Sequence, residues 1–178
     1  EKMFLSIVEG KTVKDLMIIP TDESYEINIL SNSYILLMNK SLNVAYMIDP
    51  KNSDNPLQAY VTNIKKFSWL NDSLLYWNDH EINVYHVPSK TKQTIERTSE
   101  KINNASWHNG LVSIFAIING QLKIFEFDNR DKRNVLNYQD LGLLENNNAT
   151  ICFSKNSEEI YTNFNTNDKQ GIYRLTIQ

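Results

Sequence analysis

The sequence predicts an all-β protein: a β-propeller of about four blades with four antiparallel strands each, either complete in itself or part of a larger propeller. Three observations lead to this prediction. Short runs rich in β-branched and aromatic residues alternate with turns rich in Asn and Asp. A unit of about 40 residues recurs along the chain. Apolar residues nowhere keep the helical i, i+3, i+4, i+7 spacing over the roughly 11–18 residues that indicate an amphipathic helix.

The repeat is clearest in two segments that each contain a tryptophan near their start. Trp69 and Trp107 lie 38 positions apart, and each is followed by a two-residue turn signal, Asn-Asp or Asn-Gly, of the kind that closes a β-hairpin. A second turn signal, Asn78-Asp79 or Asn119-Gly120, comes before a later strand. This strand also matches, since residues 82–87 and 122–127 both alternate apolar and polar side chains before a charged turn. Four short strands in each repeat are typical of a propeller blade.

The repeat divides the chain, one propeller domain or segment over residues 1–178, into blade units. The predicted units are residues 25–63, 64–101, 102–141 and 142–178, preceded by residues 1–24. We expect residues 3–8 and 13–19 to form two strands around a turn at Glu9-Gly10-Lys11. These strands either belong to a preceding unit or complete the last blade, which lacks a fourth strand. If the propeller is open instead, its bare strand edges favour a homodimer.

Composition and charge disfavour some classes of binding partner. The net charge is −3 and the isoelectric point is about 5.6, which disfavours a broad basic face for nucleic acid. No apolar run approaches the roughly 20 residues of a membrane helix, so we expect no direct membrane insertion. The one cysteine, Cys152, allows no internal disulfide and is expected to be a small buried apolar residue. The chain begins at Glu1, so the missing signal peptide leaves the compartment open.

No catalytic constellation is present in the sequence. Nucleophile, phosphate-loop and metalloprotease motifs are absent, and the histidines lack the spacing of a zinc site. Glu158 and Glu159 are adjacent on a predicted strand, so their side chains point to opposite faces. Lys65-Lys66 and Lys90/Lys92 make at most a small basic spot, which the nearby Glu96 and Glu100 dilute. We therefore predict no catalytic, cofactor-binding or metal-ligating residues, and a protein that is not an enzyme.

The aromatic residues carry the prediction of a binding surface. In a propeller, aromatics that recur with the repeat mostly pack one blade on the next. One or two can instead line a binding face on the loops or at the mouth of the channel. The candidates are Tyr76, Trp77 and His108.

Three segments resemble a known blade motif. Residues 151–161 (ICFSKNSEEIY) look like the F-S-P-D-G-x-x-I-Y motif of TolB-like propellers, and residues 67–76 and 105–115 look like degenerate copies of it. The sequence departs from the motif at its Pro-Asp-Gly turn, and it has no Trp-Asp dipeptide of the WD repeat. Residues 79–102 also resemble propellers found beside PEGA domains in bacterial envelope proteins. The resemblance spans residues 25–177 and implies a TolB-like or WD-like propeller, an extracytoplasmic or envelope location and an interaction role.

Two functional classes follow from this sequence. The first is a non-catalytic scaffold that binds a protein partner, for which a wide apolar loop patch is typical. The alternative is a carbohydrate- or peptide-binding propeller module, accessory to a hydrolase outside this chain. A channel mouth lined by clustered Trp, Tyr and carboxylates would favour that alternative.

Overall fold

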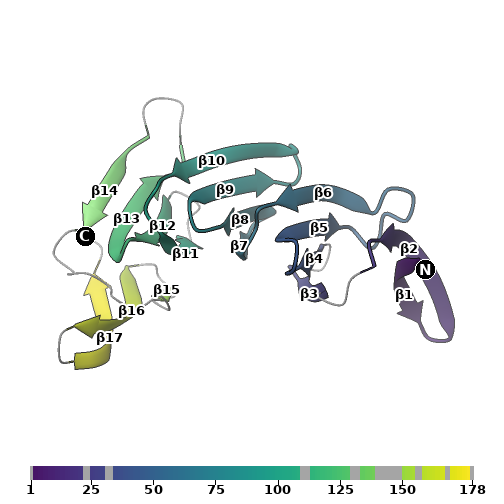
Figure 1. Ribbon diagram of the computed structural model, residues 1–178, viewed down its shortest axis with the longest axis horizontal. Coiled ribbons are helices and arrows are strands. Elements are labelled where there is room, and N and C mark those ends of the chain that lie inside the picture. The colour runs from purple at the N-terminus through teal and green to yellow at the C-terminus, as the bar shows by residue number, and fades with distance from the viewer. Residues whose placement is uncertain are drawn as a thin grey trace. The chain divides into compact units, whose positions relative to one another are not determined.

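The computed structural model (Figure 1) describes residues 2–21, 25–30, 34–108, 113–128, 133–138, 150–154, 158–166 and 169–176. Every regular element in these ranges is a β-strand, and neighbouring strands pair antiparallel. Nothing helical in the described part of the chain has the length and apolar character of a membrane span. The chain divides into two compact units, Glu1–Ile64 and Lys65–Gln178. The all-β prediction is confirmed.

The first unit contains a hairpin and a four-stranded sheet. The hairpin joins β1 (Met3–Glu9) to β2 (Thr12–Ile19) through a turn in which Gly10 has a φ of 61°. The sheet has the order β3 (Tyr25–Ile29), β4 (Ile35–Asn39), β5 (Val44–Ile48), β6 (Leu57–Thr62). Leu5 and Met17 from the hairpin pack against the core of the sheet around Leu37 and Ile48, so hairpin and sheet share one core. The two N-terminal strands expected from the sequence are confirmed.

The second unit contains three sheets. The first has the strands β7 (Lys66–Leu70), β8 (Ser73–Trp77), β9 (Glu81–His86) and β10 (Thr91–Arg97). The second has β11 (Ile102–Trp107), β12 (Ser113–Ile118), β13 (Gln121–Glu126) and β14 (Val135–Tyr138). The third has the three strands β15 (Ile151–Phe153), β16 (Glu159–Thr166) and β17 (Lys169–Thr176). Within each sheet the strands follow one another in chain order, so each sheet is one supersecondary unit of the repeat.

Asparagine makes the tight turns that the sequence predicted. Asn71 and Asp72 have φ values of 42° and 58° and close the β7–β8 hairpin in two residues. Asn119 and Gly120, with φ values of 49° and 74°, do the same between β12 and β13. Two consecutive positive φ angles are the requirement of a type I′ turn, which matches the twist of the flanking strands. The predicted turn at Asn109-Gly110 lies outside the described residues.

The second sheet of this unit is covered on both faces. Along β12, Ile114, Ala116 and Ile118 contribute to a core cluster shared with the first sheet. The intervening Phe115 and Ile117 contribute to another cluster, which includes residues of β15 and β16 from the third sheet. Successive side chains of a strand point to opposite faces, so one strand supplies two cores. This explains why β12 is a continuous run of apolar residues rather than an alternation of apolar and polar residues.

The expectation that Cys152 is buried is wrong. The thiol is exposed, whereas Ile151 is buried and Phe153 packs against the cluster between the second and third sheets. The pleat of β15 accounts for this difference, because Cys152 lies between two residues that point to the core and so points the other way. The small size and low polarity of cysteine, which favour burial on average, do not decide the face of a strand.

Candidate functional site: a lysine-lined pocket in the second unit

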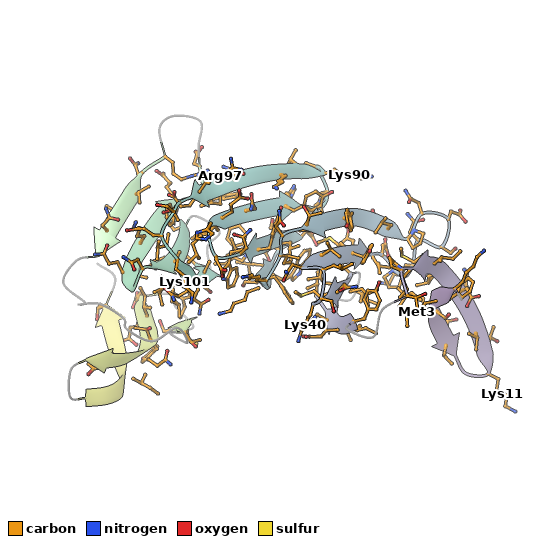
Figure 2. All side chains as sticks on the ribbon, viewed as in Figure 1. Met3, Lys11, Lys40, Lys90, Arg97 and Lys101 are labelled. Atoms are coloured by element: carbon orange, nitrogen blue, oxygen red, sulfur yellow. The ribbon has the colours of Figure 1, made fainter. Side chains whose placement is uncertain are left out.

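The first two sheets of the second unit are joined at one end, where β8 and β10 finish and where β7 and β11 begin. The β8–β9 loop at residues 78–80 and the β10–β11 connection at residues 98–101 both lie here. We call the end formed by residues 65–66, 78–80 and 98–103 the pocket face. Figure 2 labels Arg97 and Lys101 beside the connection, and Lys90, which precedes β10 at the other end of the sheet. Loops carried on rigid sheets are the usual place for binding residues.

A pocket of about 190 Å³ opens in the pocket face. Its lining residues come from both sheets and from the two connections: Lys65, Lys66, Trp77, Asn78, Asp79, Lys101, Ile102 and Asn103. The mixture of an indole and an aliphatic side chain with amides, ammonium groups and a carboxylate is typical of a site that combines apolar contact with polar orientation.

Backbone hydrogen bonds fix the segments around the pocket, and the bond between Ile102 and Asp79 joins the two sheets. The Ile102 amide donates to the Asp79 carbonyl at 2.8 Å, and the Thr98 amide donates to the His80 carbonyl at 3.0 Å. The Lys65 amide donates to the Trp77 carbonyl at 3.0 Å. Each bond ties the start or end of one strand to a neighbouring segment. The pocket walls are therefore fixed by the main chain rather than by side chains alone.

The β8–β9 loop owes its shape to Asn78. The Oδ1 atom of Asn78 accepts hydrogen bonds from the amides of His80, at 2.8 Å, and Glu81, at 2.9 Å. The backbone amide of Asn78 in turn donates to the backbone carbonyl of Glu81 at 3.1 Å. A short amide side chain that caps its own loop in this way is an Asx turn. The loop thus presents Asp79 at the pocket in a defined position.

The charge of the side chains that line the pocket is predominantly positive. The Lys65 ammonium pairs with the Asp79 carboxylate at 2.5 Å, with both side chains nearly half exposed. The hydrogen bond from Lys65 is the main cause that lowers the pKa of Asp79, and the charges of His80 and Lys101 act in the same direction. The Lys66 ammonium crosses from the first sheet to the second and donates to the Asn103 carbonyl at 3.1 Å. Three lysines and one aspartate line the pocket, which leaves an excess of positive charge.

The structure brings only one of the three predicted binding residues to the pocket. Trp77 lines it, yet its side chain is 4% exposed and belongs to the core cluster between the first two sheets. Its indole Nε1 is buried without a hydrogen-bond partner in the described part of the protein. Tyr76 is also buried, at 3% exposed, and burial raises its pKa to about 12. The Lys92 ammonium lies 5.7 Å from the centre of the Tyr76 ring.

His108 lies away from the pocket, just after β11 ends. Its ring is 5.7 Å from that of Phe115 and meets the edge of Phe153 at 5.4 Å, centre to centre. The two phenylalanine rings are themselves in edge contact at 4.9 Å. His108 therefore contributes to an aromatic cluster between the second and third sheets. Binding roles for Tyr76, Trp77 and His108 remain predictions.

Sequence reasoning missed the lysines that line the pocket. Along the chain, Lys65 and Lys66 form only a basic spot diluted by glutamates, and nothing next to Lys101 singles it out. A signal is nevertheless present, because Lys65 and Lys101 each precede the first strand of a repeat unit and lie 36 positions apart. Residues at equivalent positions of neighbouring repeats come together where two sheets pack.

Comparison with known proteins identifies the fold. No protein-family model matches the sequence, and no curated protein matches it. Solved structures do match. Hsv2 of Kluyveromyces marxianus aligns with a TM-score of 0.66 at 13% identity, over 97% of this chain and 56% of the other. A chain of the mitotic checkpoint complex aligns at 0.61 and 14% identity, over 93% and 51%.

A third match is the N-terminal domain of Nup159, with a TM-score of 0.58 and 11% identity over 97% of this chain and 48% of the other. The chain thus spans about half the length of the solved structures that it matches. At these identities the likeness concerns the fold alone. The four-stranded antiparallel sheets of this chain are the blades of such propellers, and the chain has a WD-like β-propeller fold.

Proposed function

We propose that this protein is a non-catalytic propeller scaffold and that it binds a protein partner through the pocket face. The observation that carries the proposal is the pocket itself, which lies where the chain passes from one blade to the next. Apolar and charged side chains line it together, and backbone hydrogen bonds, one of them between the two blades, hold its walls. Such a preformed and partly polar surface suits the anchoring of a side chain from another protein.

The solved structures that share the fold support a protein partner. One is a chain of the mitotic checkpoint complex, and another belongs to the yeast heterotrimeric Nup82–Nup159–Nup116 nucleoporin complex. Those propellers are found in assemblies of several proteins, and the same role is proposed for this chain. The envelope location implied by the TolB-like resemblance stays a prediction.

Site-specific photo-crosslinking tests the proposal. A photoreactive phenylalanine analogue replaces His80, which is exposed on the pocket face, or Lys90, which is exposed at the opposite end of the same blade. Irradiation of the whole protein in its native cells should give a discrete protein adduct from position 80 and little or none from position 90. Adducts of equal yield from both positions, or none from position 80, would contradict a partner on the pocket face.

A further inference from the structure

The described residues that line the pocket carry more positive than negative charge, with three lysines and one aspartate. Asp79 is the one carboxylate among the described residues that line it, and the Lys65 ammonium is already paired with Asp79. The nearby Glu100 is engaged by Lys123, with 3.1 Å between the Nζ and Oε2 atoms. Lys66 donates to a neutral carbonyl, which stabilises its position without neutralising its charge. The lining therefore favours an anionic ligand.

The size of the pocket limits what that ligand can be. Sites for small molecules and cofactors usually have volumes of about 300–1,000 Å³. At about 190 Å³ this pocket is smaller than that range. It has room for one side chain that enters from outside rather than for a whole nucleotide or sugar. A single side chain from a docked protein is the anchor that interface hot spots use.

The main chain of the pocket argues against a phosphate group. Phosphate sites usually present several backbone amides to the ligand, as in nests and at helix N-termini. Here the amides of Lys65 and Ile102 already donate to carbonyl oxygens of the β8–β9 segment. The ammonium groups of the lysines are flexible donors that act as point charges, and these suit a single carboxylate. Carboxylate oxygens accept such charge-assisted bonds well.

The wall beneath the lysines is apolar, and it holds an unsatisfied donor. Trp77 and Ile102 line the pocket and belong to the core between the first two sheets. The Trp77 Nε1 atom is buried without a partner in the described part of the chain, so the pocket wall already lacks one acceptor. The Nε1 atom of Trp107 is in the same state although Trp107 does not line the pocket. The lysines, rather than the indole, therefore carry the inference.

We infer that the pocket binds the carboxylate of an Asp or Glu side chain in an acidic segment of a partner protein, with Lys66 and Lys101 as its charge partners. This inference rests on the proposed function, because it names the chemistry by which the partner is held. The methylene groups beside the carboxylate contact Trp77 and Ile102. Binding weakens as ionic strength rises, because exposed ammonium groups are screened by salt.

Peptide selection tests this chemistry even while the partner is unidentified. A display library of random twelve-residue peptides is selected against the whole protein at low salt, and binders are measured by fluorescence anisotropy. The inference expects Asp and Glu to be enriched, and a Glu→Gln change in a selected peptide to weaken binding about tenfold. A phosphoserine at the same position should bind no more tightly than Glu.

Matched variants locate the site. Lys66→Met/Lys101→Met removes both charges but keeps the apolar stems, and it should weaken the selected peptides by about tenfold for each lysine. The single change Lys101→Met leaves the Lys66 bond to the second sheet intact and guards against misfolding. Lys90→Met/Lys92→Met, at the far end of the blade, removes the same charge and should leave affinity within about twofold.

Each other outcome overturns the inference. Peptides that ignore the Glu→Gln change, or that bind the Lys101→Met protein as tightly as the wild type, exclude a carboxylate anchor in this pocket. Phosphoserine peptides that bind more than about tenfold better than Glu peptides assign the site to phosphate instead. If crosslinks still form at position 80 in any of these cases, only the carboxylate chemistry fails. If they do not form, the proposed function fails as well.

Discussion

Replacing Trp107 by alanine tests how the blades of the second unit are held together. Trp107 is the last residue of β11, is 4% exposed and lies in the core cluster between the first two sheets. Trp69 occupies the matching place in the preceding repeat but is only half-buried. The same substitution at both positions therefore changes the same chemistry in two environments. We expect Trp107→Ala to be the more destabilising of the two.

The magnitude follows from three contributions. Truncating a buried Trp to Ala typically costs about 3–5 kcal/mol of unfolding free energy. Trp107 also makes an edge contact with Phe127, 5.4 Å between ring centres, and such a pair adds about 0.5–1.5 kcal/mol. Removal of the buried, unpartnered Nε1 atom returns about 1 kcal/mol. The net expectation is a loss of about 2.5–5.5 kcal/mol. Trp69→Ala should lose about half of that, because the half-buried Trp69 side chain buries less apolar area on folding.

Urea unfolding followed by far-UV circular dichroism measures both losses. The midpoint should fall for both variants at an unchanged m-value, which shows that the native state remains compact. Trp107→Phe keeps a ring beside Phe127 and removes the unpartnered donor, so its loss should stay below about 1.5 kcal/mol. A loss at Trp69 that equals or exceeds the loss at Trp107 would refute the assignment of Trp107 to the core between blades.

Three further predictions concern turns, blade contacts and pH. Asn119→Val should cost about 1–2 kcal/mol in urea unfolding, because Asn119 has a φ of 49°. Arg133→Met should lower the free energy of unfolding by about 1–3 kcal/mol, since Arg133 donates to two carbonyls of β10. As a control, Arg97→Met removes only an exposed ion pair and should cost under about 1 kcal/mol. Stability should fall between pH 10 and about 12 and less steeply in Tyr76→Phe, because the folded state keeps the Tyr76 proton longer than the unfolded chain.

Each of these predictions has an outcome that would contradict it. If Asn119→Val leaves the free energy of unfolding unchanged, the turn adopts another conformation in solution. Equal losses for Arg133→Met and Arg97→Met would show that the bonds to β10 contribute no more than the exposed ion pair of Arg97 with Glu81. The raised pKa of Tyr76 stabilises the folded state fully below pH 10, and this stabilisation is lost by about pH 12. Over that range the free energy of unfolding falls by no more than about 1.4 kcal/mol per pH unit. Identical pH profiles for wild type and Tyr76→Phe would contradict its burial.

Local signals in the sequence were sufficient to predict the strands and several turns. The hairpin around Gly10 and the turns at Asn71-Asp72 and Asn119-Gly120 were predicted from residues that tolerate positive φ, and the structure has positive φ angles there. The third strand of the second repeat, expected at residues 82–87, runs over Glu81–His86. Turn geometry and alternation depend on neighbours along the chain, so one sequence carries this information.

The faces of strands and the depth of side chains could not be predicted in the same way. Cys152 was expected to be buried by residue type and is exposed by the register of β15. Trp69 and Trp107 match in the repeat, yet Trp107 is buried in the core cluster between the first two sheets of the second unit, whereas Trp69 is only half-buried. Both properties depend on which sheet packs against which face, and residue type alone does not specify that.

The sequence separation of contacts between blades explains how the pocket could have been found. Side-chain hydrogen bonds join Lys66 to Asn103, Gln93 to Phe127 and Arg133 to Thr94, at separations of 37, 34 and 39 residues. These separations are close to the repeat of about 40 residues, since each blade touches only its neighbours. A site between two blades is therefore built from residues about one repeat apart, as Lys65 and Lys101 are. Aligning the repeats and asking which polar residues recur before the first strand brings these two lysines together, although in the linear sequence each is an ordinary surface charge.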